Sequence, residues 1–337
     1  MRCADFTAPG HIAFRTDAQL PVPAPGEVLV AVRACGICGS DLHMFRDNTY
    51  RDKLVRETPE GYSVPGHEFA GEIAALGEGV TNWQIGDRVV GVTGMGGGMA
   101  DFVTVPDNPF QLVAIPGDVP FDLAATTEPL ADGLQMVRKG APRDGENVVV
   151  IGVGIIGLGV IQAIRARGIA PERIIAVDVH EKRLAKAREV GATHTVNARD
   201  GDVFTAIGAI CGIAESYAGT SANVALVFDC AGYIRHMQGP PPLETALQLV
   251  VPEGRIVCFG GFEGRMEIDL SPLIQKQPTI FGSNGYAAAE LAEALHLMHS
   301  GKVDRACLLS HYYPLDQIDA AFTAQMQPDA VKVMLRI

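Results

Sequence analysis

Two short segments in the first quarter of the chain carry side chains that could bind a metal ion. CGICGSDLH contains Cys35 and Cys38, and VPGHEFAGEI contains His67 and Glu68, with His67 placed 29 residues after Cys38. A thiolate, an imidazole and a carboxylate can form a zinc site with three protein ligands and an open fourth position, the arrangement that a catalytic zinc requires. These residue types therefore favour a catalytic metal site, although composition alone does not establish one.

Two other chemistries remain open for the Cys35-x-x-Cys38 pair. The two thiols could form a redox pair, although the pattern of elements around them is not typical of thioredoxin. They could also form half of a structural zinc site. The sequence, however, has no second Cys-x-x-Cys or Cys/His pair that would complete four ligands.

A glycine-rich motif near the middle of the chain indicates a nucleotide site. GVGIIG supplies Gly152, Gly154 and Gly157 directly after the apolar run 148–151 and before a helical stretch. The first glycine allows a tight turn, the second lets the backbone approach a pyrophosphate, and the third permits close packing of the helix on the sheet. A glycine-rich turn without a ligand is the alternative. We predict a dinucleotide site because the next strand, RIIAVD, ends in Asp178, where a carboxylate accepts hydrogen bonds from the adenosine ribose.

The residues around this motif bear on which dinucleotide is bound. The Asp178 carboxylate repels a 2′-phosphate at close range, which favours NAD over NADP. Lys182 and Arg183 follow closely enough to soften that repulsion, although Lys182 is also explained as a solvated cation of the next helix. Ile156 lies within the glycine turn and is expected either to pack against the cofactor or to belong to the core.

Two patterns of elements must position these residues. From Met1 to about Glu128, short β-like runs lie between prolines and glycines, which predicts a compact β-rich domain. The runs are 27–34, 69–76, 87–92, 99–105 and 112–115. From about Asp144, apolar strands alternate with helices, which predicts a parallel sheet covered on both faces. The sequence further predicts a helix plus a loop over 198–222, a helix over 288–300 and a final strand in VKVMLRI.

The composition excludes several classes of protein. The 337 residues carry 27 basic and 39 acidic side chains, a net charge of −12, so no basic surface for nucleic acid or an anionic membrane is expected. Seven cysteines are too few for a disulfide scaffold, and the first residues have no apolar signal segment. Glycines interrupt the most apolar stretch, 148–164, so it is a poor membrane span. We expect a cytoplasmic protein of two domains.

Five motifs occur in the order found in zinc-dependent medium-chain alcohol and polyol dehydrogenases: GICGSDLH, PGHEFAGEI, IGDRVV, GVGIIG and AVDVHEKRL. The chain resembles this family along essentially its whole length, and most closely the sorbitol and threonine dehydrogenase branch. The resemblance implies an α/β fold. Residues 1–128 and 281–337 would form a β-rich GroES-like catalytic domain that binds zinc, and residues 129–280 a Rossmann NAD-binding domain with a doubly wound parallel sheet. The family also implies a homodimer or homotetramer.

The resemblance assigns the metal ligands residue by residue. It implies that Cys38 is the zinc thiolate, that His67 is the imidazole ligand and that Glu68 is a carboxylate that ligates the metal or exchanges with water. Glu128, in TTEPLADG, falls where the family has its third ligand or a carboxylate close to the metal-bound water. Without the family, Glu128 is equally explained as an acidic residue in the first turn of a helix. Cys35 has no implied role and is expected to be a packed thiol.

The family also implies a proton relay and a contact to the adenosine. Ser40 would take the proton of the alcohol, and a cofactor ribose hydroxyl would pass it to His43 and solvent. Histidine suits the last position because its unperturbed pKa lies near neutrality. On its own, Ser40 is also explained as a local hydrogen-bonding cap, and His43 as a surface histidine. Arg183 is the residue that the family uses beside the adenosine.

One departure from the family limits the metal content. Many relatives hold a structural zinc with four closely spaced cysteines, whereas the corresponding stretch here, VTGMGGGMADF (92–102), contains no cysteine. We therefore predict one zinc ion per chain, at the catalytic site. The departure also weakens the transfer of substrates from relatives that have the four cysteines.

The function that these observations favour is hydride transfer between NAD and a small alcohol, polyol or amino alcohol, with zinc polarising the alcohol oxygen. One alternative is a zinc-free, NADPH-dependent reductase of the quinone type, which the ligand set and Asp178 disfavour. A second alternative is a non-catalytic nucleotide-binding relative. The presence of every expected ligand disfavours it.

Overall fold

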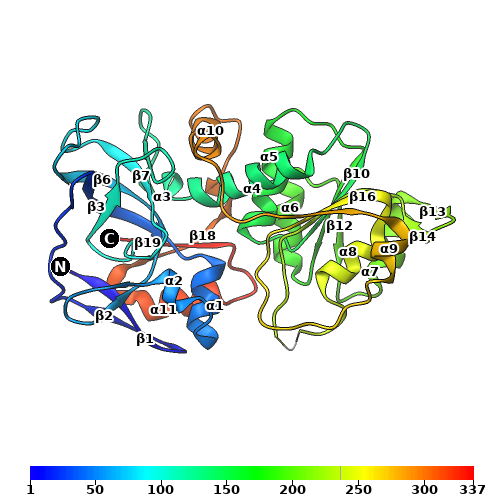
Figure 1. The fold of residues 1–337 in the computed structure, drawn as a ribbon, viewed down its shortest axis with the longest axis horizontal. Helices are drawn as coiled ribbons and strands as arrows, with labels where there is room; N and C mark the ends of the chain where they lie inside the picture. The colour runs from blue at the N-terminus through cyan, green and yellow to red at the C-terminus, as the bar shows by residue number, and fades with distance from the viewer. Residues whose placement is uncertain (236) are drawn as a thin grey trace. The chain divides into compact units, whose positions relative to one another are not determined.

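The computed structural model describes residues 1–235 and 237–337, which divide into two compact units (Figure 1). The first unit comprises Met1–Glu128 and Ala287–Ile337, and the second comprises Pro129–Tyr286. The segment 281–286 therefore belongs to the second unit, whereas the sequence places it in the first. The reason is that β17 (Thr279–Gly282) pairs with β16 (Val250–Cys258) and so extends the sheet of the second unit.

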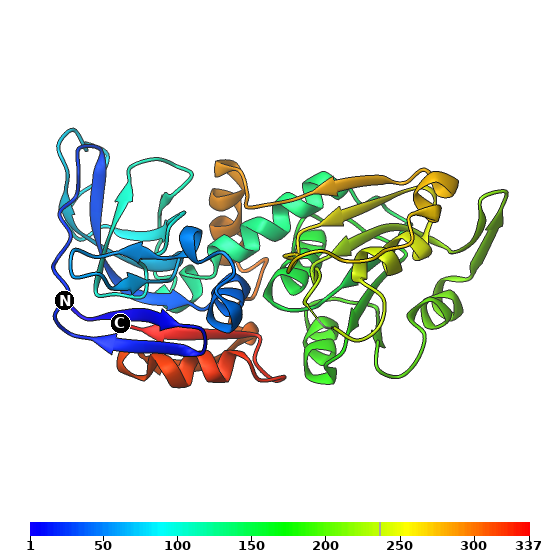
Figure 2. The same ribbon diagram turned by 60° about the horizontal axis from the view of Figure 1, so that its bottom comes forward.

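A seven-stranded sheet forms the frame of the first unit (Figure 2). Its order is β18-β19-β3-β6-β7-β9, with β8 also paired to β3. The strands are β3 (Glu27–Gly36), β6 (Glu68–Leu76), β7 (Arg88–Val92), β8 (Phe102–Pro106), β9 (Leu112–Ala114), β18 (Leu309–Pro314) and β19 (Lys332–Arg336). β3 and β6 are antiparallel, with Cys35 opposite Phe69, so the end of β3 lies beside the start of β6. This pairing brings the two segments with metal-binding side chains together.

The final strand of the chain joins this sheet next to β3. β19 runs antiparallel to β3, with Met334 opposite Gly36 and Leu335 opposite Cys35. The sequence predicts the strand but not its partner, because the pattern VKVMLRI contains no information on which edge it meets. The pairing places Lys332, at the start of β19, close to the segment that follows β3.

The rest of the first unit differs from the prediction at its N-terminus. A hairpin of β1 (Cys3–Ala8) and β2 (His11–Arg15) is present, although no strand is predicted there. Its first strand is buried over four successive residues and lacks the polar–apolar alternation that reveals a strand. β8 starts at Phe102 rather than at 99. The smaller elements are β4 (Arg56–Glu57), β5 (Ser63–Val64), α1 (Gly39–Asp47), α2 (Arg51–Leu54), α3 (Phe121–Ala124), α10 (Ala288–His299), η1 (Ala306–Leu308), η2 (Leu315–Gln317) and α11 (Ile318–Gln325).

A glycine loop occupies the stretch 92–102 in place of a cysteine-rich lobe. Its backbone is hydrogen-bonded to the segment just before His67: Gly97 donates to the carbonyl of Val64 at 2.9 Å and Gly98 to that of Gly66 at 2.8 Å. Thr93 donates to the carbonyl of His67 at 3.0 Å. Backbone hydrogen bonds therefore hold this loop against the chain that carries the imidazole.

The second unit is built on a six-stranded parallel sheet in the order β12-β11-β10-β15-β16-β17. This is the 3-2-1-4-5-6 order of the Rossmann fold, so the predicted doubly wound architecture is confirmed. The strands not yet given are β10 (Asn147–Ile151), β11 (Arg173–Asp178), β12 (His194–Asn197) and β15 (Val224–Asp229). All five residues of β10 are buried, as its apolar run 148–151 predicts.

Helices cover the sheet in two groups. α5 (Ile155–Ala166) contacts α6 (Glu181–Glu189), while α8 (Pro242–Leu249) contacts both α7 (Val203–Cys211) and α9 (Ser271–Lys276). α4 (Thr127–Gly140) leads into this unit. The prediction of a helix plus a loop over 198–222 is partly wrong, because a hairpin of β13 (Ile213–Ser216) and β14 (Gly219–Ala222) follows α7. A tight Tyr217-Ala218 turn joins its two short strands.

Candidate active site

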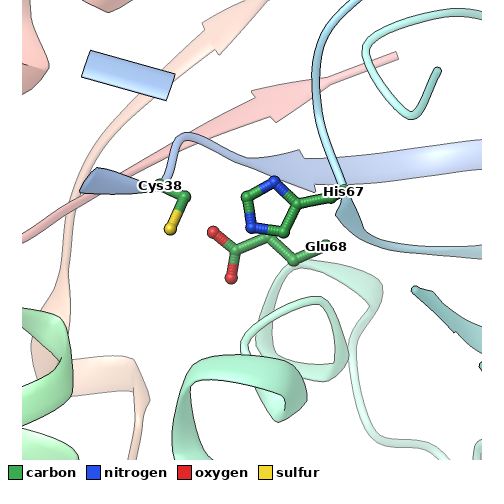
Figure 3. Close-up of side chains that lie close together, drawn as sticks. All are labelled: Cys38, His67 and Glu68. Atoms are coloured by element: carbon green, nitrogen blue, oxygen red, sulfur yellow. The ribbon is translucent and has the colours of Figure 1, made fainter. Parts of the chain in front are cut away.

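Three predicted ligands meet in the first unit. The ligand atoms of Cys38, His67 and Glu68 all lie within 4.8 Å of one another, and their side chains converge (Figure 3). Cys38 occupies the N-cap of α1, His67 directly precedes β6 and Glu68 is the first residue of β6. Gly66, with φ +90°, turns the chain there, and a Cβ at this position would lie 2.9 Å from the Cys35 sulfur. Two separate turns thus direct the three side chains to one point.

Asp41 supports two of these residues from behind. Its Oδ2 accepts a hydrogen bond from the backbone N–H of Cys38 at 2.9 Å, and its Oδ1 lies 3.9 Å from Nδ1 of His67. Asp41 is completely buried, and burial raises its pKa. A carboxylate facing one ring nitrogen leaves the other nitrogen available to a metal. Sequence reasoning gave Asp41 no role, although an acidic residue three positions after an N-cap is the signal of a capping interaction.

Lys332 contacts Glu68, the carboxylate of the ligand group. Its Nζ forms an ion pair with Oε1 of Glu68 and donates to the carbonyl of Ile37 at 3.0 Å. Both side chains are completely buried. Burial is the largest single influence and lowers the pKa of Lys332, but the charges of Glu68, Cys38 and Glu128 and the hydrogen bond to Glu68 together outweigh it and raise that pKa. Nothing in the sequence pattern singles out Lys332.

The electrostatics of the group favour a bound cation. Burial raises the pKa of the Cys38 thiol to about 12, and the charge of Glu68 acts in the same direction. Burial would lower the pKa of His67, but Asp41, Glu128 and Glu68 together raise it. Oε2 of Glu68 is buried and has no hydrogen-bond partner within the described residues. A divalent ion would satisfy this oxygen and stabilise the thiolate, so the donor set fits zinc.

Glu128 and Cys35 stand apart from the three ligands. Glu128 is buried in the first turn of α4 and lies outside the group whose atoms fall within 4.8 Å, yet its charge acts on His67. Cys35 is fully buried on β3, and burial raises its pKa well above the usual range. Cys35 therefore has the environment of a packed thiol. Arg305, which sequence reasoning missed, is also buried, and burial lowers its pKa to about 10.

The glycine turn of the second unit has the local geometry of a dinucleotide site. Gly152 has φ +83°, and a Cβ there would lie 2.7 Å from that of Ala231. A Cβ on Gly157 would lie 2.1 Å from the carbonyl oxygen of Gly152, so only glycine permits this approach of helix and strand. Gly154, the N-cap of α5, faces open space. The three positions match the turn, the packing contact and the phosphate approach of the motif.

Asp178 ends β11 and is linked to the same turn. Its Oδ2 accepts a hydrogen bond from the N–H of Val153 and its Oδ1 one from the N–H of His180, both at 2.9 Å. The carboxylate is therefore partly used for holding the turn. Ile156 is half-buried in the first turn of α5. Arg183 is half-buried at the start of α6, whereas Lys182 is exposed.

Comparison with known proteins identifies the family of this chain. Residues 24–117 match the model of the alcohol dehydrogenase GroES-like domain, and residues 156–300 match that of the zinc-binding dehydrogenases. The (R,R)-butanediol dehydrogenase of Bacillus subtilis is 31% identical, with 94% of each chain covered. The sorbitol dehydrogenase of Halalkalibacterium halodurans is 30% identical, with 97% of this chain and 96% of the relative covered. The chain belongs to the zinc-containing medium-chain alcohol dehydrogenase family.

A solved structure agrees with this assignment. The alcohol dehydrogenase rspB of Escherichia coli CFT073, determined in complex with NADH, is 26% identical and superimposes with a TM-score of 0.83 over 100% of this chain and 99% of its own. The predicted family and the GroES-like plus Rossmann fold are therefore confirmed. The chain is a zinc-type dehydrogenase. Within residues 1–235 and 237–337, no helix is both long and apolar enough to cross a bilayer.

The two residues of the predicted proton relay lie on one helix of this dehydrogenase. Ser40 and His43 are three positions apart on α1, so they share a face. Oγ of Ser40 is buried and makes no hydrogen bond to the described residues. His43 is half-buried, and its ring stands edge-on to the ring of Tyr50, with 6.2 Å between the ring centroids. Nδ1 of His43 lies 3.2 Å from Nη2 of Arg46. Ser40 and His43 lie two and five positions after Cys38, and α1 fixes their positions relative to it.

Proposed function

We propose that this dehydrogenase oxidises a small alcohol or polyol with NAD, and that Cys38, His67 and Glu68 hold its one catalytic zinc ion. The observation that carries the proposal is the convergence of these three ligand atoms within 4.8 Å. Glu68 is favoured over Glu128 as the third ligand, because Glu128 lies outside that group. When bound, zinc would lower the pKa of the substrate alcohol toward neutrality, as zinc does for water.

Two side chains of α1 are proposed to transfer the proton of the alcohol to solvent. Oγ of Ser40 is buried, has no partner within the described residues and lies two positions after Cys38, so it accepts the proton of an alcohol placed at the ligand group while it releases its own hydroxyl proton toward His43. His43, on the same face of α1 and half-exposed, passes the proton to solvent. Glu128 adds a buried negative charge beside His67 and stabilises positive charge at the centre. These roles rest on the placement of α1 and on the family.

The second unit supplies the binding of NAD. The open space at Gly154 admits a pyrophosphate to the N-terminus of α5, and Asp178 favours a ribose with free hydroxyls. Ile156, at the start of α5, is proposed to pack against the cofactor, and Arg183, at the start of α6, to contact its adenosine. When bound, NAD accepts the hydride.

The relatives narrow the substrate class. Butanediol and sorbitol each carry a hydroxyl group next to a second hydroxyl-bearing carbon. We therefore include vicinal diols and polyols as the first candidates, with amino alcohols and simple secondary alcohols beside them. A screen of these four classes with NAD and, separately, NADP identifies both the substrate and the cofactor. We further propose that the protein is cytoplasmic and forms a homodimer or a homotetramer.

Replacing Cys38 by Ser tests the metal assignment. Zinc supplies several kcal/mol of transition-state stabilisation, so Cys38→Ser should lower alcohol oxidation on the order of a thousandfold, with loss of bound zinc. NAD binding, measured by calorimetry, should persist because the glycine turn is untouched. The matched control is Cys211→Ser, a half-buried thiol at the end of α7. Full activity of Cys38→Ser would refute the assignment, and an active wild-type enzyme without zinc would favour the quinone-type reductase.

A further inference from the structure

A buried contact between Lys332 and Glu68 links the two chain segments that form the first unit, Met1–Glu128 and Ala287–Ile337. Lys332 begins β19 and Glu68 begins β6, and neither side chain reaches solvent. Nζ of Lys332 pairs with Oε1 of Glu68 and donates to the carbonyl of Ile37, one residue before Cys38. A fully buried ammonium group is costly unless its partners have good geometry. Both partners of the Lys332 ammonium group, the Glu68 carboxylate and the Ile37 carbonyl, belong to the segments that carry the proposed metal ligands.

The two oxygens of Glu68 have different environments. Oε1 is held by Lys332, whereas Oε2 is buried and has no hydrogen-bond partner within the described residues. Glu68 nevertheless belongs to the group whose ligand atoms lie within 4.8 Å of one another. A carboxylate that is fixed at one oxygen has lost its freedom to rotate, and its second oxygen then points in a defined direction.

We propose that Lys332 is a positioning residue of the metal centre, which holds Oε1 of Glu68 so that Oε2 is presented to the ion beside Cys38 and His67. The proposal rests on the function proposed above, because it requires that these three residues bind the ion. Lys332 itself touches neither the ion nor the substrate. It acts through Glu68, and through Ile37 it also ties the turn that carries Cys38.

Gly36 keeps open the path along which Lys332 reaches Glu68. A Cβ at Gly36 would lie 2.5 Å from Cε and 2.7 Å from Nζ of Lys332, and 3.1 Å from Oε1 of Glu68. Gly36 has no positive φ, so alanine is compatible with the backbone there. Gly36→Ala therefore displaces the ammonium group while every charge is retained. This variant therefore tests the effect of the position of the ammonium group, whereas Lys332→Met tests the effect of its loss.

The experiment compares Lys332→Met and Gly36→Ala with wild type, and uses Lys276→Met as the matched control. Lys276 is also buried, but the hydrogen bonds that it donates within the described residues go to the carbonyls of Leu247 and Gln248, in the second unit. Three quantities are measured: retention of zinc against a chelator, the visible spectrum after replacement of zinc by cobalt, and the midpoint of thermal unfolding. The cobalt spectrum reports the ligand geometry and does not depend on activity.

We expect both test variants to retain zinc about 10–100-fold less well and to show an altered cobalt spectrum, as is typical when a residue behind a metal ligand is lost. Lys276→Met should lose stability with an unchanged spectrum. Unchanged zinc retention and an unchanged cobalt spectrum in both test variants would overturn the proposal and leave Lys332 a structural residue. If Lys332→Met does not fold, Gly36→Ala decides. A wild-type protein that binds no zinc would instead refute the proposed function.

Discussion

At the scale of single residues, burial determines the chemistry of the ionisable groups. Glu68 and Lys332 are both fully buried and neutralise each other, whereas the buried Asp229 at the end of β15 faces no cation within the described residues. Its Oδ1 accepts hydrogen bonds from the N–H groups of Ala231 and Gly232 at 3.1 and 2.9 Å. Burial nevertheless raises its pKa to about 6. Two backbone donors therefore compensate only partly for the loss of water.

This raised pKa predicts how Asp229→Asn changes stability with pH. Between the ordinary value of 3.8 and the folded value of about 6, the folded state binds more protons, so the contribution of Asp229 to stability is full at low pH and is lost as pH rises through 6. Asparagine stays neutral and keeps the oxygen that accepts both N–H groups. The variant should gain up to about 3 kcal/mol over wild type at pH 8, and the gain should shrink toward pH 4.

Urea unfolding of both proteins at pH 4, 6 and 8 measures this effect. A control at Asp202 is informative, because this exposed N-cap of α7 has a lowered pKa from its hydrogen bonds to Thr205. Asp202→Asn should not share this trend: its loss of stability should persist from pH 8 to pH 4, because the contribution of a carboxylate with a lowered pKa disappears only as pH falls below the ordinary value of 3.8. A gain for Asp229→Asn that does not vary with pH would contradict the ionisation of Asp229 in the folded state.

At the scale of elements, turns at strand ends place the functional groups. Cys38 follows β3 as the N-cap of α1, His67 precedes β6, and Gly154 is the N-cap of α5 after β10. Each of these positions lies where backbone N–H groups or side chains leave regular hydrogen bonding and can face a ligand. The same helix that presents Cys38 also presents Ser40. A shift of α1 would therefore move Cys38 and Ser40 together.

The glycine turn allows binding and packing to be separated. Gly154 has φ −72° and open space around its missing Cβ, so Gly154→Ala should leave the unfolding midpoint within about 2 °C of wild type. A methyl group there keeps the pyrophosphate away from the helix N-terminus, and NAD should bind about tenfold more weakly. Calorimetric titration with NAD measures the affinity.

Gly157→Ala is the matched comparison on the same helix. Its Cβ would overlap the carbonyl oxygen of Gly152, so this variant should lose about 1–3 kcal/mol of stability through strain. Equal effects of the two substitutions on stability would contradict the open space at Gly154. An unchanged NAD affinity in Gly154→Ala would show that this space is not the pyrophosphate site.

At the scale of the whole molecule, the described residues contain one group of three or more His, Cys, Asp or Glu side chains that could hold a metal ion, namely Cys38, His67 and Glu68. The loop 92–102, where many relatives carry four cysteines, is held by backbone hydrogen bonds to the segment before His67. We therefore predict that elemental analysis of the purified protein gives about one zinc per chain. Two zinc ions per chain would contradict the prediction, because the loop has no thiolates to bind the second.

The sequence alone was sufficient for the features that depend on neighbours in the chain. The buried strand β10, the glycine turn and the strand ending in Asp178 follow from local chemistry, because tight turns and phosphate approach require particular residues at particular spacings. The family, the Rossmann fold and the donor types of the candidate centre followed from the same motifs. These features need no knowledge of distant contacts.

Only the tertiary structure decided which distant groups meet. Lys332 lies 264 positions from Glu68, and its strand β19 could have paired with any free edge. Asp41 faces His67, and the first strand joins a hairpin, because sheet pairing and packing bring these segments together. Local patterns reveal which side of an element is apolar, but not which element covers it. The partners of a buried charge therefore depend on long-range packing that no short segment encodes.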